Sequence, residues 1–179
     1  AGSATDHVAR VIGPHLGTLL GQNVVVDNKA GANGIIAVQD LMRAPADGSV
    51  MMLGSLSPLA INVALMKNLP YDPRRDLTPI AGAYLTNQVL MVKASSPARS
   101  LGDFIAQAKA QPGKLTVGHS TSLVQTEIAS MEKLAGVTLM PVPYKGIPAS
   151  VNDVMGGTLD ATFVDMVNAV ALVKNGQMR

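Results

Sequence analysis

The segment KLTVGHSTSLVQTEIASMEKLAGVTLMPVP, residues 114–143, decides the fold of this chain. Its apolar start predicts a strand over 114–118, its polar residues 119–122 predict a loop, and the residues up to Ala135 predict a helix. A second apolar run predicts a strand over 138–143. Two strands joined through a helix by short loops are typical of a parallel sheet that helices cover on both faces. The segment therefore predicts an α/β fold.

The same alternation of strands and helices continues on both sides of this segment. Helices are predicted over 5–20, 35–42, from Pro58 onward, over 101–110 and 148–155, and in a last segment that ends at Gly176. Further strands are predicted over 23–27, 50–53, 80–85, 88–92 and 159–164. The strands 80–85 and 88–92 form either a hairpin or two successive strands of a sheet. We therefore expect parallel or mixed sheets flanked by helices.

A segment of small and polar residues, ASSPARS at 94–100, interrupts this alternation. Segments rich in Ser, Pro and Ala between periodic regions are typical of linkers. We therefore predict a first α/β lobe over 1–98 and a second lobe over 99–179, with a hinge near 94–100. A cleft between two such lobes is the default location of a ligand site.

Composition and charge exclude several classes of function. The chain has 179 residues, of which 47% are hydrophobic and 15% are charged, as is typical of a globular protein. The net charge of +2 is spread along the sequence rather than gathered in a stripe, so we expect no nucleic-acid partner. No apolar run approaches the roughly 20 residues of a membrane-spanning helix, so we expect no membrane insertion.

Metal-dependent and nucleophilic catalysis find little support in the sequence. The chain has no Cys, which excludes a thiolate nucleophile and a thiolate metal site. The three histidines, at positions 7, 15 and 119, share no metal-binding spacing, so we expect neither a metal nor another cofactor. Ser120 or Ser122 offers a hydrolase nucleophile, but the segment GHSTS at 118–122 lacks the second glycine of the G-x-S-x-G motif.

Four polar loops share one expected location, the C-terminal end of a strand and the N-terminal end of the next helix. These loops are residues 2–5, 54–57, 119–122 and 144–146. In doubly wound sheets this edge binds ligands. Free N–H groups at helix starts, together with Ser and Thr hydroxyls, suit a carboxylate or a phosphate. Helix capping is the simpler interpretation for any single loop, but we expect at least two of the four to contribute to one ligand site.

The turn that follows the expected strand 138–143 carries a tyrosine and a lysine. Lys145 has three alternative partners: an acidic ligand, a neighbouring carboxylate such as Asp153 or Asp165, or solvent. Tyr144 is expected to pack at the interface of the two lobes. We include both residues among the candidate ligand-binding residues.

Five motifs together resemble those of a known protein family. They are VVDNKAGANG at 25–34, PADG at 45–48, LPYDP at 69–73, PVPYKG at 141–146 and DVMGG at 153–157. In this order and spacing, they resemble the extracytoplasmic solute-binding receptors of tripartite tricarboxylate transporters, the Bug or TctC family. The resemblance implies a two-lobed periplasmic binding protein of the type II-like, Venus-flytrap class, in a Gram-negative bacterium.

The resemblance also implies a function without catalysis. Such receptors capture a small mono-, di- or tricarboxylate and deliver it to the membrane permease subunits of the transporter. The family holds one carboxylate through two loops, largely by backbone N–H groups, hydroxyls and bridging waters. By position, the residues implied are Gly2, Ser3, Ala4, Thr5, His119, Ser120, Thr121 and Ser122. Residues Ser55, Ser57 and Asp165 lie where the family sets its selectivity.

The chain departs from the family pattern in its length. Family members begin with a strand before the first loop and continue beyond the position of Arg179, so the resemblance implies a chain truncated at both ends. No basic leader precedes the first turn, so we expect no signal peptide within these residues. Two alternatives to a receptor stay open: a serine-type hydrolase, and a non-binding receptor remnant that self-associates because its lobes are incomplete.

Overall fold

The computed structural model describes residues 2–179 and divides the chain into two compact units, Ala1–Leu85 and Thr86–Arg179. This division falls earlier than the predicted boundary after residue 98. Strand β1 (Gln88–Val92) pairs with a strand of the second unit, and Ala98 is buried in the core of that unit. The segment 94–100, where we expected the hinge, therefore lies inside the second unit.

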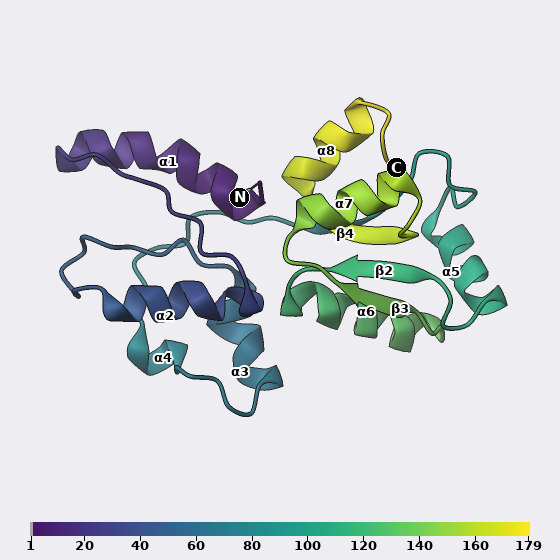
Figure 1. Ribbon diagram of the computed structural model, residues 1–179, viewed down its shortest axis with the longest axis horizontal. Helices are drawn as coiled ribbons and strands as arrows, with labels where there is room; N and C mark the ends of the chain where they lie inside the picture. The colour runs from purple at the N-terminus through teal and green to yellow at the C-terminus, as the bar shows by residue number, and fades with distance from the viewer. Residues whose placement is uncertain (1) are drawn as a thin grey trace. The chain divides into compact units, whose positions relative to one another are not determined.

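The first unit is built from helices and irregular segments (Figure 1). Its elements are α1 (Ala4–Leu20), η1 (Ala32–Gly34), α2 (Ile35–Arg43), η2 (Ser57–Ile61), α3 (Asn62–Leu65) and α4 (Pro73–Asp76). The helices expected over 5–20 and 35–42 are thereby confirmed. The helix expected from Pro58 onward is short, because a π turn, η2, leads directly into the single turn of α3.

Three strands expected in the first unit are not formed. Within residues 2–85, the segments 23–27, 50–53 and 80–85 carry no strand pairing. Several of their apolar side chains are exposed, Val25 by 85% and Ile80 by 78%. A strand, unlike a helix, needs a hydrogen-bonded neighbour, and the β-branched pattern says nothing of whether a neighbour exists. The strand predictions for these segments are therefore wrong for the first unit as the structure describes it.

Buried polar side chains hold the turns of the first unit in place. The side-chain amide of Asn62, which is fully buried, donates to the carbonyl of Asn33 at 3.0 Å. The hydroxyl of Tyr71 donates to the carbonyl of Pro58 at 2.7 Å. Gly34 adopts a φ of +86°, and a Cβ there would lie 2.9 Å from the Pro58 ring. This close approach requires glycine at position 34.

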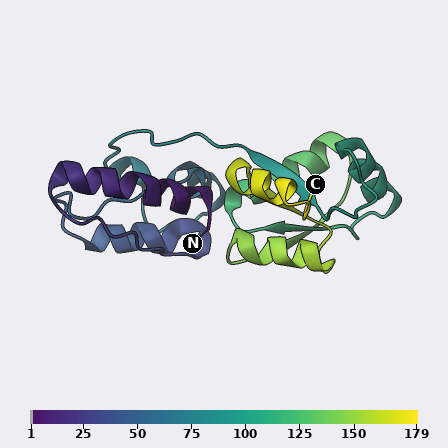
Figure 2. The ribbon, with the colours of Figure 1, turned by 90° about the horizontal axis from the view of Figure 1, so that it is seen from above.

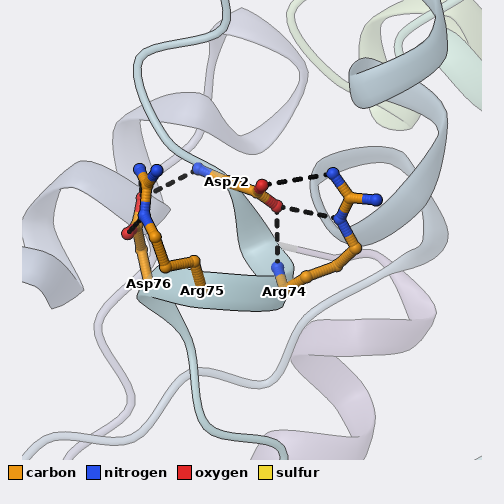
Figure 3. A network of polar contacts seen from close by, with 4 residues as sticks. All are labelled: Asp72, Arg74, Arg75 and Asp76. Atoms are coloured by element: carbon orange, nitrogen blue, oxygen red, sulfur yellow. Dashed lines mark hydrogen bonds and ion pairs between the residues drawn. The ribbon is translucent and has the colours of Figure 1, made fainter.

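The short helix α4 carries a network of charged side chains (Figure 3). Arg74 donates to both carboxylate oxygens of Asp72, at 3.1 and 3.2 Å, and Arg75 likewise to Asp76, at 2.8 and 3.2 Å. The Asp76 carboxylate also accepts from the backbone N–H of Asp72 at 2.8 Å. These bonds lower the pKa of both carboxyl groups. They hold the single turn of α4, which begins at the last residue of the LPYDP motif.

The second unit contains a four-stranded mixed sheet with the strand order β1-β4-β2-β3. The other strands are β2 (Thr116–His119), β3 (Met140–Pro143) and β4 (Ala161–Asp165). Strands β4, β2 and β3 run parallel, as the segment 114–143 predicts, whereas β1 runs antiparallel to β4. The predicted strand 88–92 is thus confirmed, but its partner is β4, neither a hairpin strand over 80–85 nor a strand next to it in sequence.

Helices cover both faces of this sheet, as expected. They are α5 (Leu101–Ala110), α6 (Ser122–Ala135), α7 (Ile147–Gly156) and α8 (Met166–Lys174). One buried cluster joins Phe104 of α5 and Ile128 of α6 to the sheet, and a second joins Val154 of α7 and Ala169 of α8 to it. Figure 2 shows α7 and α6 on opposite sides of the strands. The apolar core therefore lies in two layers around the sheet.

Candidate functional site

The ends of all four strands of the second unit lie at one edge of its sheet, and polar residues stand at three of them. The parallel strands β2, β3 and β4 end there, at His119, Pro143 and Asp165. Because β1 is antiparallel to β4, its first residue, Gln88, lies at the same edge, in register with Asp165. We call this row of strand ends and the loops that follow them the polar edge. It is the location where open α/β sheets bind ligands.

The loop 119–122 joins the end of β2 to the start of α6, as its sequence predicts. The Thr121 hydroxyl caps α6 by accepting from the backbone N–H of Val124 at 3.3 Å. Ser122 is buried, and Ser120 is half-buried. Burial also lowers the pKa of His119, which favours the neutral form of its ring. A helix start with hydroxyls and a neutral imidazole offers hydrogen-bond donors to an anion without a fixed positive side chain.

A chain of buried hydroxyls lies beneath this loop, and sequence reasoning did not find it. The Ser150 hydroxyl of α7 donates to the carbonyl of Ile147 at 2.9 Å, and the Thr162 hydroxyl of β4 donates to Ser150 Oγ at 2.9 Å. Thr162 Oγ1 also lies 3.3 Å from the carbonyl oxygen of Gly118. These contacts hold α7 and β4 against Gly118 of β2, the residue directly before His119.

Tyr144 packs against an apolar cluster of the second unit, and its expected place at the interface of the two lobes stays a prediction. Its ring contacts the apolar cluster around Val154, and its hydroxyl donates to the Asp153 carboxylate at 2.6 Å. This bond raises the pKa of Tyr144 to about 12. Its neighbour Lys145 is exposed, and within residues 2–179 no ion pair joins it to Asp153 or Asp165. Neither carboxylate is therefore the partner of Lys145 among the described residues.

Asp165 and Gln88 form the other end of the polar edge. Asp165 is 2% exposed and caps α8, since its carboxylate accepts from the backbone N–H of Asn168 at 3.1 Å and from its side-chain amide at 2.9 Å. The side-chain oxygen of Gln88 is buried and has no hydrogen-bond partner among residues 2–179. No sequence pattern points to Gln88, because its place beside Asp165 depends on the antiparallel pairing of β1.

The first unit places the candidate residues 2–5 at the start of α1. Ser3 caps this helix by accepting from the backbone N–H of Asp6 at 3.3 Å. Ala4 is buried, and the hydroxyl oxygens of Thr5 and Tyr84 lie 2.7 Å apart. The helix start is therefore ordered by contacts within its own unit.

Asp6 holds this helix start together through a network that the sequence did not reveal. Its carboxylate accepts from the backbone N–H of Gly2 at 2.9 Å, from Arg10 Nε at 3.1 Å and from Asn28 Nδ2 at 3.0 Å. The bonds from Gly2, Asn28 and Arg10 hold the pKa of Asp6 well below its usual range. Asn28 lies in the VVDNKAGANG motif, so this network gives that motif a structural role.

The remaining candidates of the first unit lie at the start of η2. Ser57 begins this turn and is 2% exposed, whereas Ser55 is half-buried in the preceding loop.

Among residues 2–179, no group of three or more His, Asp or Glu side chains is placed to hold a metal ion. In the same residues, no helix is long and apolar enough to cross a membrane.

Comparisons with known proteins agree with the five motifs. The model of the tripartite tricarboxylate transporter family receptor, TctC, matches residues 8–179. Protein BugT of Bordetella pertussis is 34% identical over 184 aligned residues, which cover 99% of this chain and 56% of BugT. A UPF0065 protein from the tcbD–tcbE intergenic region of a Pseudomonas species is also 34% identical, over 89% of this chain and 48% of its own length.

Solved structures show the same fold. A periplasmic transporter structure superposes with a TM-score of 0.89 at 31% identity, covering all of this chain and 61% of its own. Rpa4515 of Rhodopseudomonas palustris, solved with adipate, gives a TM-score of 0.88 at 30% identity. MatC of the same organism, solved with bound malate, superposes with a TM-score of 0.89 at 26% identity. The chain thus has the α/β fold of periplasmic binding proteins and spans about 60% of their length.

The chain spans about half the length of the curated relatives it matches. The matched family model describes a transporter receptor, the structural neighbours include the periplasmic binding protein BugD, and no catalytic family is indicated. The match to the receptor model extends over nearly all of the sequence, through both units of the structure. The chain therefore belongs to the TctC family of tripartite tricarboxylate transporter receptors.

Proposed function

We propose that this chain belongs to a periplasmic receptor that captures a small organic carboxylate and delivers it to the permease of a tripartite tricarboxylate transporter. The observation that carries the proposal is the family match over residues 8–179. The structural neighbours MatC and Rpa4515 hold malate and adipate, which makes a dicarboxylate the first ligand class to test. The protein performs no catalysis in this proposal.

The structure supports an anion-binding role for the polar edge. The start of α6 presents backbone N–H groups and hydroxyls that can donate to a carboxylate, and the loop 119–122 carries no acidic side chain that would repel it. The start of α1 offers the same chemistry around Ser3 and Thr5. We keep residues 2–5, Ser55, Ser57, 119–122, Lys145 and Asp165 as proposed ligand-binding residues. Tyr144 is proposed only as a packing residue, because its hydroxyl proton is already donated to Asp153.

A melting experiment with a panel of carboxylates tests this proposal. A ligand at 100 times its Kd stabilises the native state by about 2.7 kcal/mol, so the melting temperature rises by several degrees. We expect such a rise with at least one mono-, di- or tricarboxylate. The Ser120→Ala variant is expected to weaken it, whereas Ser130→Ala, on the exposed side of α6, leaves it unchanged. The proposal fails if no carboxylate changes the melting temperature.

One observation favours a second candidate, a chain that self-associates and binds no ligand. The first unit exposes several large apolar side chains, among them Leu19 at 83% and Val25 at 85%. Exposed apolar surface of this kind promotes association. Light scattering distinguishes the two candidates: a monomer that carboxylates stabilise supports the receptor, and a dimer that no carboxylate stabilises supports self-association.

A further inference from the structure

The side-chain oxygen of Gln88 is an acceptor without a donor at the polar edge. It is buried, and no donor of the described part of the chain reaches it. An unsatisfied buried acceptor costs about 1–3 kcal/mol, and such an atom in a native protein calls for an explanation, of which a bound group that donates to it is one. Gln88 is the first residue of β1, so its side chain stands at the edge of the sheet where the parallel strands end.

The pairing of β1 with β4 places the side chains of Gln88 and Asp165 side by side. The backbone N–H of Met166 donates to the carbonyl of Asn87 at 3.0 Å. In an antiparallel ladder, this bond makes Gln88 and Asp165, the next residues inward, a non-hydrogen-bonded pair. Residues in such a pair have Cα atoms about 4.5 Å apart, and their side chains project from the same face.

Both side chains present acceptors at this end of the polar edge. The Asp165 carboxylate accepts from Asn168 and is 2% exposed, so it brings a negative charge to the site. A ligand carboxylate placed here would meet a second carboxylate and an amide oxygen, which repel it. A hydroxyl or an ammonium group would instead give Gln88 the donor that it lacks. The start of α6, at the adjoining strand β2, is the better place for the ligand's carboxylate.

We propose that the ligand is a carboxylate that also carries a hydrogen-bond donor, a hydroxyl or an ammonium group, and that Gln88 with Asp165 recognises this donor. The inference rests on the proposed receptor function and deepens it by naming the ligand class. Gln88 is then a specificity residue that no motif of the sequence identifies. A site built around a buried acceptor rejects an analogue that lacks the donor, because the acceptor stays unpaired.

Calorimetric titration with three matched dicarboxylates tests this assignment. Succinate has no donor besides its carboxylates, L-malate adds a hydroxyl and L-aspartate adds an ammonium group. We expect malate, aspartate or both to bind the wild-type chain at least about tenfold more tightly than succinate. The two substituted ligands then show which donor the site takes, since Asp165 favours the charged ammonium over the hydroxyl.

Variants of Gln88 separate recognition from folding. Gln88→Met keeps the length of the side chain and removes the acceptor, so the preference over succinate is expected to fall to about twofold or less. Gln88→Glu keeps an acceptor and is expected to retain the preference for aspartate. Gln107→Met is the matched control, because Gln107 is also partly buried but lines a small cavity with Leu115 and Asp160 at the opposite edge of the sheet. Melting temperatures confirm that each variant is folded.

The outcomes distinguish this inference from the proposed function. Equal affinity of the wild-type chain for the three ligands overturns the inference and leaves the receptor proposal intact. Weakening of all three ligands by the same factor in Gln88→Met also overturns it, because the residue would then act on the whole site. If none of the three ligands binds and no other carboxylate stabilises the chain, the receptor proposal itself fails.

Discussion

At the scale of single residues, the buried hydroxyl of Thr162 is expected to stabilise the fold. It is 1% exposed and links Ser150 of α7 to Gly118 of β2. Thr162→Val keeps the shape and removes both contacts, so we expect a loss of about 1–2 kcal/mol in the free energy of unfolding. Thr162→Ser keeps the hydroxyl and is expected to cost less. Urea denaturation measures both, and an equal loss in the two variants would contradict the role of the hydroxyl.

The pKa of Tyr144 predicts a change of stability at alkaline pH. The bond to Asp153 raises this pKa from 10.0 to about 12. A raised pKa stabilises the folded state below about pH 10, the unfolded value, and this stabilisation is lost as the pH rises towards 12. We expect the wild-type chain to lose more stability than Tyr144→Phe between these values. If the stability of the wild-type chain and of Tyr144→Phe falls by the same amount between these pH values, the prediction is contradicted.

At the scale of secondary-structure elements, the start of α1 depends on the charge of Asp6. Three donors, from Gly2, Arg10 and Asn28, lower the pKa of Asp6 below its usual 3.8. A lowered pKa stabilises the folded state above about pH 4, and this stabilisation is lost as the pH falls below that value. We expect Asp6→Asn to destabilise the chain at pH 7. We also expect the free energy of unfolding of this variant to fall less than that of the wild-type chain as the pH is lowered below about 4. Asp27→Asn, at a mostly exposed carboxylate near Asn28, serves as the control.

Helices of the second unit were predictable from the sequence, whereas the pairing of its strands was predictable only in part. The helices 101–110 and 122–135 follow from local capping and periodicity, since Ser100 and Asp103 form a capping box and Gly136 ends α6 in the left-handed conformation. Strands depend on distant partners, so the antiparallel pairing of β1 with β4 was not predictable from residues 88–92 alone. The loop 119–122 was located by its local pattern, whereas Gln88, Ser150 and Thr162 enter the site only through sheet register and packing.

At the scale of the whole molecule, the two units are expected to differ in independent stability. The second unit has a four-stranded sheet with an apolar cluster on each face, whereas the first has no β-ladder within residues 2–85. We expect a fragment of residues 86–179 to unfold cooperatively by itself, and a fragment of residues 1–85 to unfold without a sharp transition. Circular dichroism during heating compares them, and a cooperative transition of the first fragment alone would contradict this expectation.

The pairing of β1 with the last residues of the chain has a practical consequence. Val92 and Arg179 exchange two backbone hydrogen bonds of 2.9 Å, and Lys93 bridges Met178 in antiparallel orientation. These bonds lie on the side of β1 that faces away from β4, where the backbone groups of Leu90 also point. The residues of an affinity tag fused directly to Arg179 could continue this antiparallel pairing along the outer edge of β1 towards Gln88. A flexible, charged spacer, or a tag at the other terminus, would keep foreign residues out of the sheet during purification.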